Sequence, residues 1–406
     1  MRQFRYMRRS GHTHRPGHVR RSGHVRYGGL SGSAVVAAAI VMCAAGGPAV
    51  AVSDSSTPVA CSARALTTAV AAASAGETLS LSRDCTYRLT TPYAMGDGLP
   101  AVDLKLTIRG NGATIVRAGN PTATFRIFHV VSGGDLRLED LTVRGGSAAG
   151  DGGGVLVDGG GKLTLTGVDV LHNTATDNGG GIAVAANATA VVRRGWLGFG
   201  NAALGGAVYS RGTLSVQGAE LSRNHARTAG GALYLGAGDA FFYTSVLRRN
   251  TSAGRGGGVT VSGRAALEFS DSKIANNTAA GDEGGGIQNL SSLRLERTEV
   301  SGNVVGGTTG VGGGVYNSTA GAVLVLRDSQ VLSNSANGDG TSRAGGVYND
   351  GGRVTLDHSQ VRDNASRVAP GGVYTTNVFT VIDSTVSRNT PTNCAGSPVI
   401  VAGCRD

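Results

Sequence analysis

The sequence predicts an all-β chain folded as a single-stranded right-handed parallel β-helix. We expect a solenoid of about a dozen coils with three sheets and a short N-terminal capping helix. Three observations support this prediction. Gly is unusually frequent, with 67 of 406 residues, only 16% of residues are charged, and one short pattern of Gly, aliphatic and Asn residues recurs at a nearly fixed interval. A disordered chain would carry more charge, and a helical chain far less Gly.

The first half of each repeat has two apolar residues in alternation, then a third apolar residue, then Asn. The segment Leu163 to Asn173 gives the template, with Leu163, Leu165 and Val170 as the apolar positions. Eight copies end in Asn: Asn173, Asn224, Asn250, Asn277, Asn303, Asn334, Asn364 and Asn389. Two copies depart from the pattern, because Gly146 takes the Asn place in one and Asn201 arrives one residue late in the other.

The second half of each repeat is a run of Gly followed by an aliphatic residue, as in Gly312-Gly313-Gly314-Val315. These aliphatic residues are 25 to 28 residues apart, with one step of 32, at positions 155, 182, 208, 233, 259, 287, 315, 347 and 373. Each unit thus has three short alternating runs separated by turns, and no run is long enough for a helix. Stacked units bury together what one unit cannot bury alone. A β-propeller needs a longer unit of ~40 residues, and a leucine-rich repeat needs a different Leu spacing and a helical segment.

The recurring Asn suggests a catalytic or ligand-binding column, but a structural interpretation is stronger. Identical Asn side chains stacked coil on coil can hydrogen-bond along the stack as a ladder, and Asn also suits a turn that ends a strand. We expect Asn289, Asn317 and Asn349, two residues after the Gly-motif aliphatic, to form a second inward ladder.

Residues 1–51 have the order of a secretory signal with a long basic first part. Residues 1–52 hold eight Arg, all before residue 27, and no acidic residue. Within the same segment, an apolar stretch runs from Ala34 to Met42, and Ala49-Val50-Ala51 resembles a cleavage site. Subtracting these eight charges from the net +10 leaves +2 for the remainder. The high pI therefore does not indicate a nucleic-acid-binding protein. No other stretch approaches the ~20 apolar residues of a membrane helix, so we expect a secreted, extracellular or envelope-associated protein, most simply a monomer.

Beyond the leader, four Cys fall into two local pairs, Cys61 with Cys85 and Cys394 with Cys404. An exported protein with an even Cys count favours disulfides, although four free thiols are an alternative. Residues 62–74 read as a short helix, which together with a strand at 78–81 forms an N-terminal cap. We therefore divide the chain into a leader (1–51), an N-terminal cap (52–102), the β-helix (103–390) and a disulfide-closed C-terminal cap (391–406).

The arrangement resembles the pectate-lyase-like right-handed β-helix superfamily. The repeat itself is similar to that of polymorphic outer-membrane proteins, which pair a Gly-Gly-Ala-aliphatic motif with a Phe-x-x-Asn motif. The matching residues here include Gly205-Gly206-Ala207-Val208 and Val170-Leu171-His172-Asn173, within residues 135–390. The Phe position is aliphatic in this chain, and that family's C-terminal translocator does not follow the repeats. The resemblance implies a secreted surface or matrix protein rather than an autotransporter.

Enzymes of that superfamily cleave acidic polysaccharides with clustered carboxylates, with or without calcium, and a basic residue. No such cluster emerges from the repeats, so we assign no catalytic residue and no metal ligand. Four Asp share one turn column but are not adjacent in it: Asp140, Asp271, Asp328 and Asp383. Five loop acids precede Gly runs and are weak calcium candidates: Asp151, Asp177, Asp282, Glu283 and Asp339. The histidines His129, His172, His225 and His358 are scattered.

The residue after each Gly-motif aliphatic should point outward, because side chains alternate along a strand. In nine successive coils this column reads Leu156, Ala183, Tyr209, Tyr234, Thr260, Gln288, Tyr316, Tyr348 and Tyr374. The five Tyr are candidate carbohydrate-binding residues, since an aromatic ladder can stack against sugar rings. A stack that only stabilises the sheet is the simpler interpretation.

Three functions follow from these patterns. The first is a non-enzymatic surface or matrix protein that binds polysaccharide or envelope glycan or mediates adhesion. The second is a pectate-lyase-like polysaccharide lyase or glycoside hydrolase with a degenerate site. The third is a purely structural solenoid. The missing carboxylate cluster favours the first and third, and a fold resemblance alone assigns no function.

Overall fold

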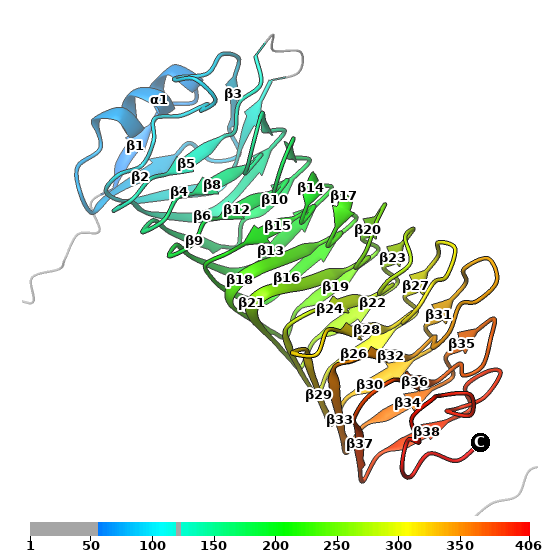
Figure 1. The fold of residues 1–406 in the computed structure, drawn as a ribbon. Helices are drawn as coiled ribbons and strands as arrows, with labels where there is room; N and C mark the ends of the chain where they lie inside the picture. Colours follow the sequence, from blue (N-terminus) through cyan, green and yellow to red (C-terminus); the bar gives the residue numbers. More distant parts are fainter. Residues whose placement is uncertain (1–55, 119–122) are drawn as a thin grey trace, which may run out of the picture. The chain divides into compact units, whose positions relative to one another are not determined.

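The computed structural model describes residues 56–118 and 123–406. The predicted leader lies outside these residues. The described chain is an all-β parallel solenoid of about 11 turns, in which every pairing between named strands is parallel. The predicted parallel β-helix is therefore confirmed, and Figure 1 shows its coils stacked in chain order.

Each coil contributes strands to four ladders, which we name A to D. Ladder A holds the Gly-motif strands: β5 (Phe128–Val130), β8 (Val155–Val157), β12 (Ile182–Val184), β15 (Val208–Ser210), the first part of β18 (Leu233–Tyr243) and of β21 (Val259–Ser270), β24 (Ile287–Asn289), β28 (Val315–Ser318), β32 (Val347–Asp350) and β36 (Val373–Thr375). Their aliphatic residues pair in register from coil to coil.

Ladder B holds the strands with two alternating apolar residues. It comprises β2 (Glu77–Leu81), the first part of β4 (Lys105–Arg117) and of β6 (Asp135–Arg144), β9 (Lys162–Thr166), the first part of β13 (Thr189–Gly198) and of β16 (Thr213–Ser222), the second part of β18 and β21, β25 (Ser292–Glu296), β29 (Val323–Arg327), β33 (Arg353–Asp357) and β37 (Phe379–Ile382).

Ladder C holds the strands with the third apolar residue. It comprises β3 (Thr86–Leu89), the ends of β4, β6, β13 and β16, β10 (Asp169–Leu171), β19 (Val246–Arg248), β22 (Lys273–Ala275), β26 (Glu299–Ser301), β30 (Gln330–Leu332), β34 (Gln360–Arg362) and β38 (Thr385–Ser387). Because several strands run through two ladders, A, B and C form one continuous 29-stranded sheet.

Ladder D is a fourth set of short strands that the sequence did not predict. It is a separate nine-stranded sheet directly after the Asn positions, made of β7 (Ser147–Ala148), β11 (Thr174–Ala175), β14 (Asn201–Leu204), β17 (His225–Ala229), β20 (Thr251–Ser252), β23 (Thr278–Ala279), β27 (Val304–Val305), β31 (Ser335–Ala336) and β35 (Ala365–Ser366). Its inward residues are mostly Ala, such as Ala175 and Ala279. Two residues with one small apolar side chain give too little periodicity to recognise.

The core runs inside the coils and follows the predicted alternation. In β9, Leu163 and Leu165 are buried between Lys162, Thr164 and Thr166, which are exposed or half-buried. The inward residues of ladders A, B and C belong to one continuous apolar cluster. Stacking is what buries them, as expected for a solenoid.

The N-terminal end is closed by the predicted helix, α1 (Ala63–Ala72), and by an unpredicted strand, β1 (Thr57–Val59). The Ser62 hydroxyl accepts a hydrogen bond from the Ala65 amide as an N-cap, and Leu66 and Val70 face the core. Strand β1 pairs with β2, and β2 with β4, so the stack begins before the regular repeats. The disulfide Cys61–Cys85 is confirmed.

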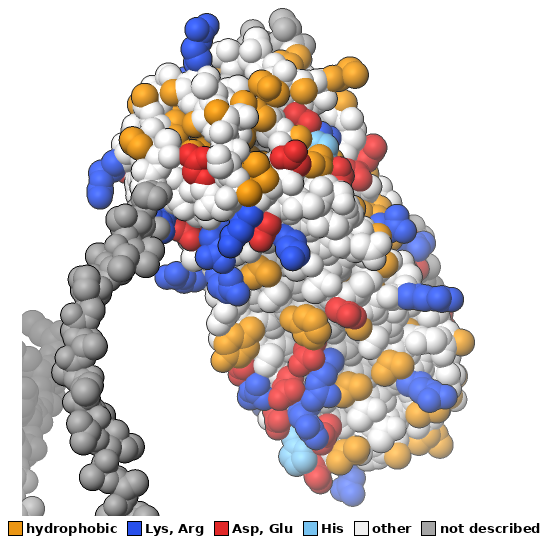
Figure 2. All heavy atoms as spheres, turned by 90° about the vertical axis from the view of Figure 1, so that its left-hand side faces the viewer, with side chains coloured by type: hydrophobic (Ala, Val, Ile, Leu, Met, Phe, Trp, Pro, Cys, Tyr) orange, Lys and Arg blue, Asp and Glu red, His pale blue; other side chains and the backbone are white. Residues whose placement is uncertain are grey.

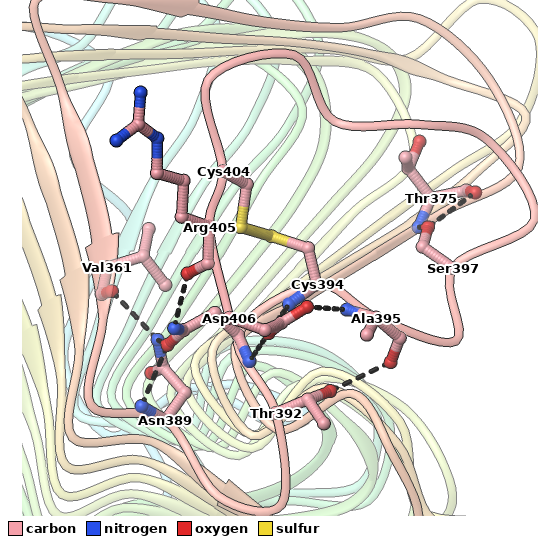
Figure 3. Close-up of a disulfide and its surroundings, with 11 residues drawn as sticks. Val361, Thr375, Asn389, Thr392, Cys394, Ala395, Ser397, Cys404, Arg405 and Asp406 are labelled. Atoms are coloured by element: carbon pink, nitrogen blue, oxygen red, sulfur yellow. Dashed lines mark hydrogen bonds between the residues drawn. A yellow bond between two sulfur atoms is a disulfide. The ribbon is translucent and has the colours of Figure 1, made fainter.

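The C-terminal end is closed by the second predicted disulfide, Cys394–Cys404, which is also confirmed (Figure 3). Asp406 accepts hydrogen bonds from the amides of Cys394, at 3.0 Å, and Ala395, at 2.7 Å. These bonds close the loop on itself, and Ser397 attaches it to the last coil, because the Thr375 amide donates to the Ser397 hydroxyl at 2.9 Å (Figure 3).

Candidate functional site

The outward column of ladder A contains the five Tyr singled out from the sequence. Register pairing places Tyr209 beside Tyr234, and Tyr316, Tyr348 and Tyr374 in successive coils. The column also extends one coil further toward the N-terminus than expected, because His129 pairs with Leu156.

The Tyr rings form two separate stacks. The ring centroids of Tyr209 and Tyr234 are 5.7 Å apart, those of Tyr316 and Tyr348 are 5.7 Å apart, and those of Tyr348 and Tyr374 are 4.6 Å apart. The guanidinium of Arg343 covers the Tyr374 ring at 5.4 Å. Tyr348 therefore has a ring against each of its faces, and burial raises the pKa of its phenol.

The column is less exposed than alternation alone suggests. Tyr316 is only 7% exposed, and Thr260 and Gln288 are buried although they point away from the core. Residues of ladder D and of the segments that follow it, such as Thr228 and Arg255, line a pocket over this column, so the column is the floor of a groove rather than a flat surface.

The break between the two Tyr stacks is hollow. A pocket of about 380 Å³ lies over Thr260 and Gln288, beside the ring of Tyr234. Its wall is largely apolar and includes Leu204, Ala229, Ala253 and Leu290. Because Tyr209 stacks on only one side of Tyr234 and the next residue in the column is the small Thr260, the other side of this aromatic ring faces the pocket.

Polar groups define the rest of this pocket. Gln288 donates from Nε2 to Glu283 Oε2 at 2.6 Å, and Glu283 forms an ion pair with Arg255 at 3.4 Å. Arg227 also lines the pocket and donates to Asn201 Oδ1 at 3.1 Å. The pocket thus combines one aromatic ring, apolar walls and a few fixed donors and acceptors, a combination typical of small-ligand sites.

A smaller hollow of about 190 Å³ continues the groove toward the N-terminus. It is lined by Tyr209, Leu156, Ala183, Asp151 and Arg211, among others. Asp151 accepts two hydrogen bonds from Asn178, one from the amide and one from the side chain, at 3.0 and 2.8 Å.

His129 ends the column in a cluster of charged groups. Its Nδ1 is 2.9 Å from Asp97 Oδ2, and its Nε2 is 2.9 Å from Asp158 Oδ2. Arg126 Nη1 donates to Asp97 Oδ1 at 2.5 Å. The hydrogen bond to Asp97 raises the pKa of His129 against the opposing effect of burial. Burial alone would raise the pKa of Asp97, but the hydrogen bonds from His129 and Arg126 outweigh it and lower that pKa.

The sequence did not reveal this cluster. His129 had appeared isolated, and Asp97 lies in the irregular cap segment outside the repeats. Extending the outward column by one coil would have placed His129 in it, beside Leu156. Asp158 would then have been recognised as a neighbour, because it comes three residues after the aliphatic Val155 of the next coil.

The repeated Asn side chains lie inside the coils. In each pair from Asn224 to Asn389, one Nδ2 donates to the next Oδ1 at 2.9 to 3.0 Å. The same Nδ2 also donates to a backbone carbonyl, as from Asn277 to Leu247. Gly146 and Gly200 occupy the Asn place in their coils, and each donates its amide to the next Asn, Asn173 and Asn224. Asn201 lies one residue beyond the position that the repeat predicts for Asn, because Gly200 occupies that position.

The second Asn run is also inward. Asn289 donates to Asn317 and Asn317 to Asn349, both at 2.7 Å, and Asn349 donates to the Thr375 hydroxyl at 2.9 Å. A third run was not foreseen. Its Ser and Thr hydroxyls accept hydrogen bonds from the amide one coil earlier, at Ser272, Thr298, Ser329, Ser359 and Ser384.

This third run changes the interpretation of the Asp column. The backbone amides donate their hydrogen bonds to the hydroxyl of the Ser or Thr that follows the turn position, and not to the Asp carboxylate at that position. Asp140, Asp271, Asp328 and Asp383 adopt positive φ at the turn between ladders B and C. Asp271 pairs with Arg297 at 2.7 Å, and Asp383 lies 3.7 Å from His358. They are turn residues at four separate coils.

The loop acids have individual partners. Asp282 accepts hydrogen bonds from the amides of Thr309 and Gly310, which lowers its pKa, and Glu283 binds Arg255 and Gln288. Asp177 accepts from Thr176 at 3.3 Å. Asp339 lies in the long insert before the next Gly motif. Within residues 56–118 and 123–406, no group of three or more His, Cys, Asp or Glu could hold a metal ion.

Comparison with solved structures gives two similar chains. Pectate lyase Pel9A is 15% identical, with 82% of this chain and 75% of that chain covered and a TM-score of 0.36. PfbA, a surface adhesin of Streptococcus pneumoniae, is 10% identical, with 86% and 96% covered and a TM-score of 0.35. No protein-family model matches this chain, and no curated protein matches it.

The fold, with its two disulfides, defines the class of protein. It is a parallel β-helix protein, capped and disulfide-closed at both described ends, with a groove along the outer face of ladder A. None of the helices in the described part is long and apolar enough to cross a membrane. The similarity of the repeats to those of polymorphic outer-membrane proteins stays a prediction.

Proposed function

We propose that this protein is exported and binds polysaccharide in the ladder A groove, without catalysing a reaction. The observation that carries the proposal is the pocket at the break between the two Tyr stacks, where one face of Tyr234 is open. A pyranose ring has an apolar face that packs against an aromatic ring, and its hydroxyls need a few fixed polar partners. Gln288, Glu283 and Arg227 supply such partners around the pocket.

Export is part of the proposal. The leader-like residues 1–51 and the two disulfides support an oxidising compartment. A polysaccharide of the envelope or matrix is the ligand class that such a location makes accessible, and adhesion is the activity that follows.

The five Tyr have different parts in this proposal. Tyr234 is the residue expected to contact sugar, because Tyr348 is stacked on both sides and Tyr316 is buried. Tyr209 supports Tyr234 from behind.

The test is a glycan array with the secreted protein, followed by titration calorimetry on the best hit. Tyr234→Ala should weaken binding by ~10-fold or more, since one stacking contact contributes about 1–2 kcal/mol. Tyr348→Ala is the matched control, because it removes a Tyr of the same column away from the pocket, and it should change binding less than threefold.

Equal losses in both variants, with unchanged unfolding temperatures, would contradict the assignment of the pocket. An array on which the wild-type protein binds no glycan would remove the proposal. The alternative is a polysaccharide lyase or glycoside hydrolase. It is tested by incubating the protein with uronic-acid polymers in the presence of calcium, and the appearance of cleavage products would favour this enzymatic function over binding alone.

A further inference from the structure

The outer face of ladder B lies on another side of the coil from the Tyr groove. Three outward columns run along it. One reads Arg137, Thr164, Val191, Ser215, Phe241, Glu268 and Arg294, and a second reads Glu139, Thr166, Arg193, Gln217, Tyr243, Ser270 and Glu296. The third, at the start of the strands, includes Asp135, Lys162, Thr189, Thr213, Asp239 and Ala266. Figure 2 shows this face, the side of Figure 1 on which β9, β29, β33 and β37 are labelled.

Toward the C-terminus, the charges of this face neutralise one another. Arg294 pairs with Glu296 at 3.0 Å, Arg297 with Asp271 at 2.7 Å, and Arg327 with Asp357 at 3.0 Å. Basic and acidic side chains are intermixed there in Figure 2. This half of the face has little net charge to offer a partner.

Toward the N-terminus, the pattern changes. Lys162, Arg193 and Arg194 are exposed, and among the described residues none of the three has an ion pair or a side-chain hydrogen bond. Arg137 lies 3.8 Å from Glu139, which also pairs with Arg109 at 3.4 Å. Strand β9 and the first part of β13 carry no acidic residue, so the ladder B faces of these two adjacent coils present only positive charge. On the side of β6, Asp135 lies beside Lys162 in register. In Figure 2, basic side chains gather over these coils.

Two exposed aromatic residues lie next to this charge. Phe241 is 49% exposed and Tyr243 is 48% exposed. Tyr243 follows Arg193 in the same column with only Gln217 between them, so the two are two coils apart, or about 10 Å at the usual strand spacing. The intervening floor of Ser215 and Gln217 is polar and open to solvent.

We propose that this face is a second binding surface, and that its ligand is a linear sulfated polysaccharide. Sulfate esters stay ionised at all ordinary pH values, and a guanidinium binds their oxygens through two parallel hydrogen bonds. Arg193, Arg194 and Lys162 supply the charge. Phe241 and Tyr243 supply an apolar surface for a sugar ring, and Gln217 can hydrogen-bond to hydroxyls. The proposal is independent of the function assigned to the ladder A groove.

The experiment measures binding of heparin, as a sulfated probe, to the full secreted protein at several salt concentrations. The double variant Arg193→Ala/Arg194→Ala should lose ~10-fold or more in affinity and show a shallower dependence on salt, because two charge-assisted contacts disappear. Phe241→Ala/Tyr243→Ala should lose ~10-fold with an unchanged salt dependence, since it removes no charge.

The same face provides the matched control. Arg294→Ala/Arg327→Ala removes two Arg that already have carboxylate partners, and it should change heparin affinity less than twofold. Tyr234→Ala should leave heparin binding unchanged, which separates this surface from the groove. Circular dichroism and unfolding temperature verify that each variant is folded.

Three results would overturn the proposal. One is equal heparin affinity in the wild type and the Arg193/Arg194 variant. The second is equal binding of double-stranded DNA that is insensitive to Phe241→Ala/Tyr243→Ala, since the face would then be a non-specific positive surface. The third is equal binding of polygalacturonate, whose charges are carboxylates, since sulfate would then not be the recognised group.

Discussion

At the scale of single residues, the repeated Asn side chains satisfy backbone groups that turn inward at the end of ladder C. Each Asn in the run carries out the same task, because Nδ2 reaches a carbonyl of the previous coil while Oδ1 accepts from that coil's Asn. A buried amide or carbonyl without a partner is costly. The column is conserved within the chain for this structural reason, not for ligand binding.

Replacement of one central member tests this role. Asn277→Ala leaves the Asn250 amide, the Asn250 side chain and the Leu247 carbonyl without their partners. We expect the free energy of unfolding to fall by about 3–5 kcal/mol, measured by urea denaturation. The exposed Asn337→Ala is the control, with a change of about 0.5 kcal/mol or less. Similar losses in the two variants would rule out the ladder as a source of stability.

Gly200 shows the limit of the Asn pattern. A side chain there would place its Cβ 2.1 Å from the Gly206 carbonyl oxygen, and Gly146 is equally tight against Gly153, at 2.0 Å. Only Gly fits such an approach, and its amide still donates to the Asn of the next coil.

At the scale of elements, the charged cluster joins the N-terminal cap to the repeats. Asp97 belongs to the segment that follows β3, whereas His129 lies in β5 and Asp158 follows β8. His129 bridges the two carboxylates, and its side chain is only 17% exposed. We therefore expect the charge of His129 to determine how firmly the cap segment is attached.

The stability of this junction should depend on pH. The pKa of His129 is raised above its ordinary value of 6.5, so its contribution is complete below pH 6.5 and is lost as the pH rises through the raised pKa. The pKa of Asp97 is lowered from 3.8, so its contribution is complete above pH 3.8 and is lost as the pH falls through the lowered pKa. Between these limits the junction is most stable.

Thermal unfolding of the wild type and His129→Gln at pH 5.5 and pH 8.5 checks this expectation. The difference between the two proteins should be large at pH 5.5 and shrink at pH 8.5. A difference that grows with pH would contradict the sign of the pKa shift.

At the scale of the whole described molecule, stability is a sum over neighbouring coils, and the ends are the weak points. The C-terminal loop closes the Asn run, because Asn389 donates to Asn393 at 2.9 Å and Asn393 donates to the Arg405 carbonyl at 2.7 Å. The disulfide between Cys394 and Cys404 holds that loop in place (Figure 3).

Removal of this disulfide should loosen one end of the solenoid. In Cys394→Ser/Cys404→Ser, we expect the last coils, including the amides of Asn364 and Asn389, to lose about 2–3 kcal/mol of protection. Hydrogen exchange followed by mass spectrometry measures this loss. The coils around Leu163 serve as the internal control and should keep their protection. A uniform loss along the chain would show that the solenoid unfolds as one cooperative unit.

The sequence by itself determined the coil, the caps and the disulfides of this protein. It could do so because the same apolar pattern recurs every 25 to 28 residues. The residues at the Leu163 and Val155 positions of each copy must therefore face one common core. Ladder D escaped detection because two-residue strands with an inward Ala carry almost no periodic signal.

Only the tertiary structure decided which surfaces are open. Alternation assigned Tyr209, Tyr234, Tyr316 and Tyr348 to the outside equally. In the structure, however, Tyr316 is buried, ring stacking covers both faces of Tyr348, and of these four only Tyr234 borders the larger pocket of the groove. Asp97 and His129 are 32 residues apart in the sequence, and only the stacking of coils brings them together. Arg193 keeps an unpaired charge because no acidic side chain of a neighbouring coil reaches it in the described part of the chain. Exposure and pairing are properties of the stacked coils, which is why one repeat read alone does not contain them.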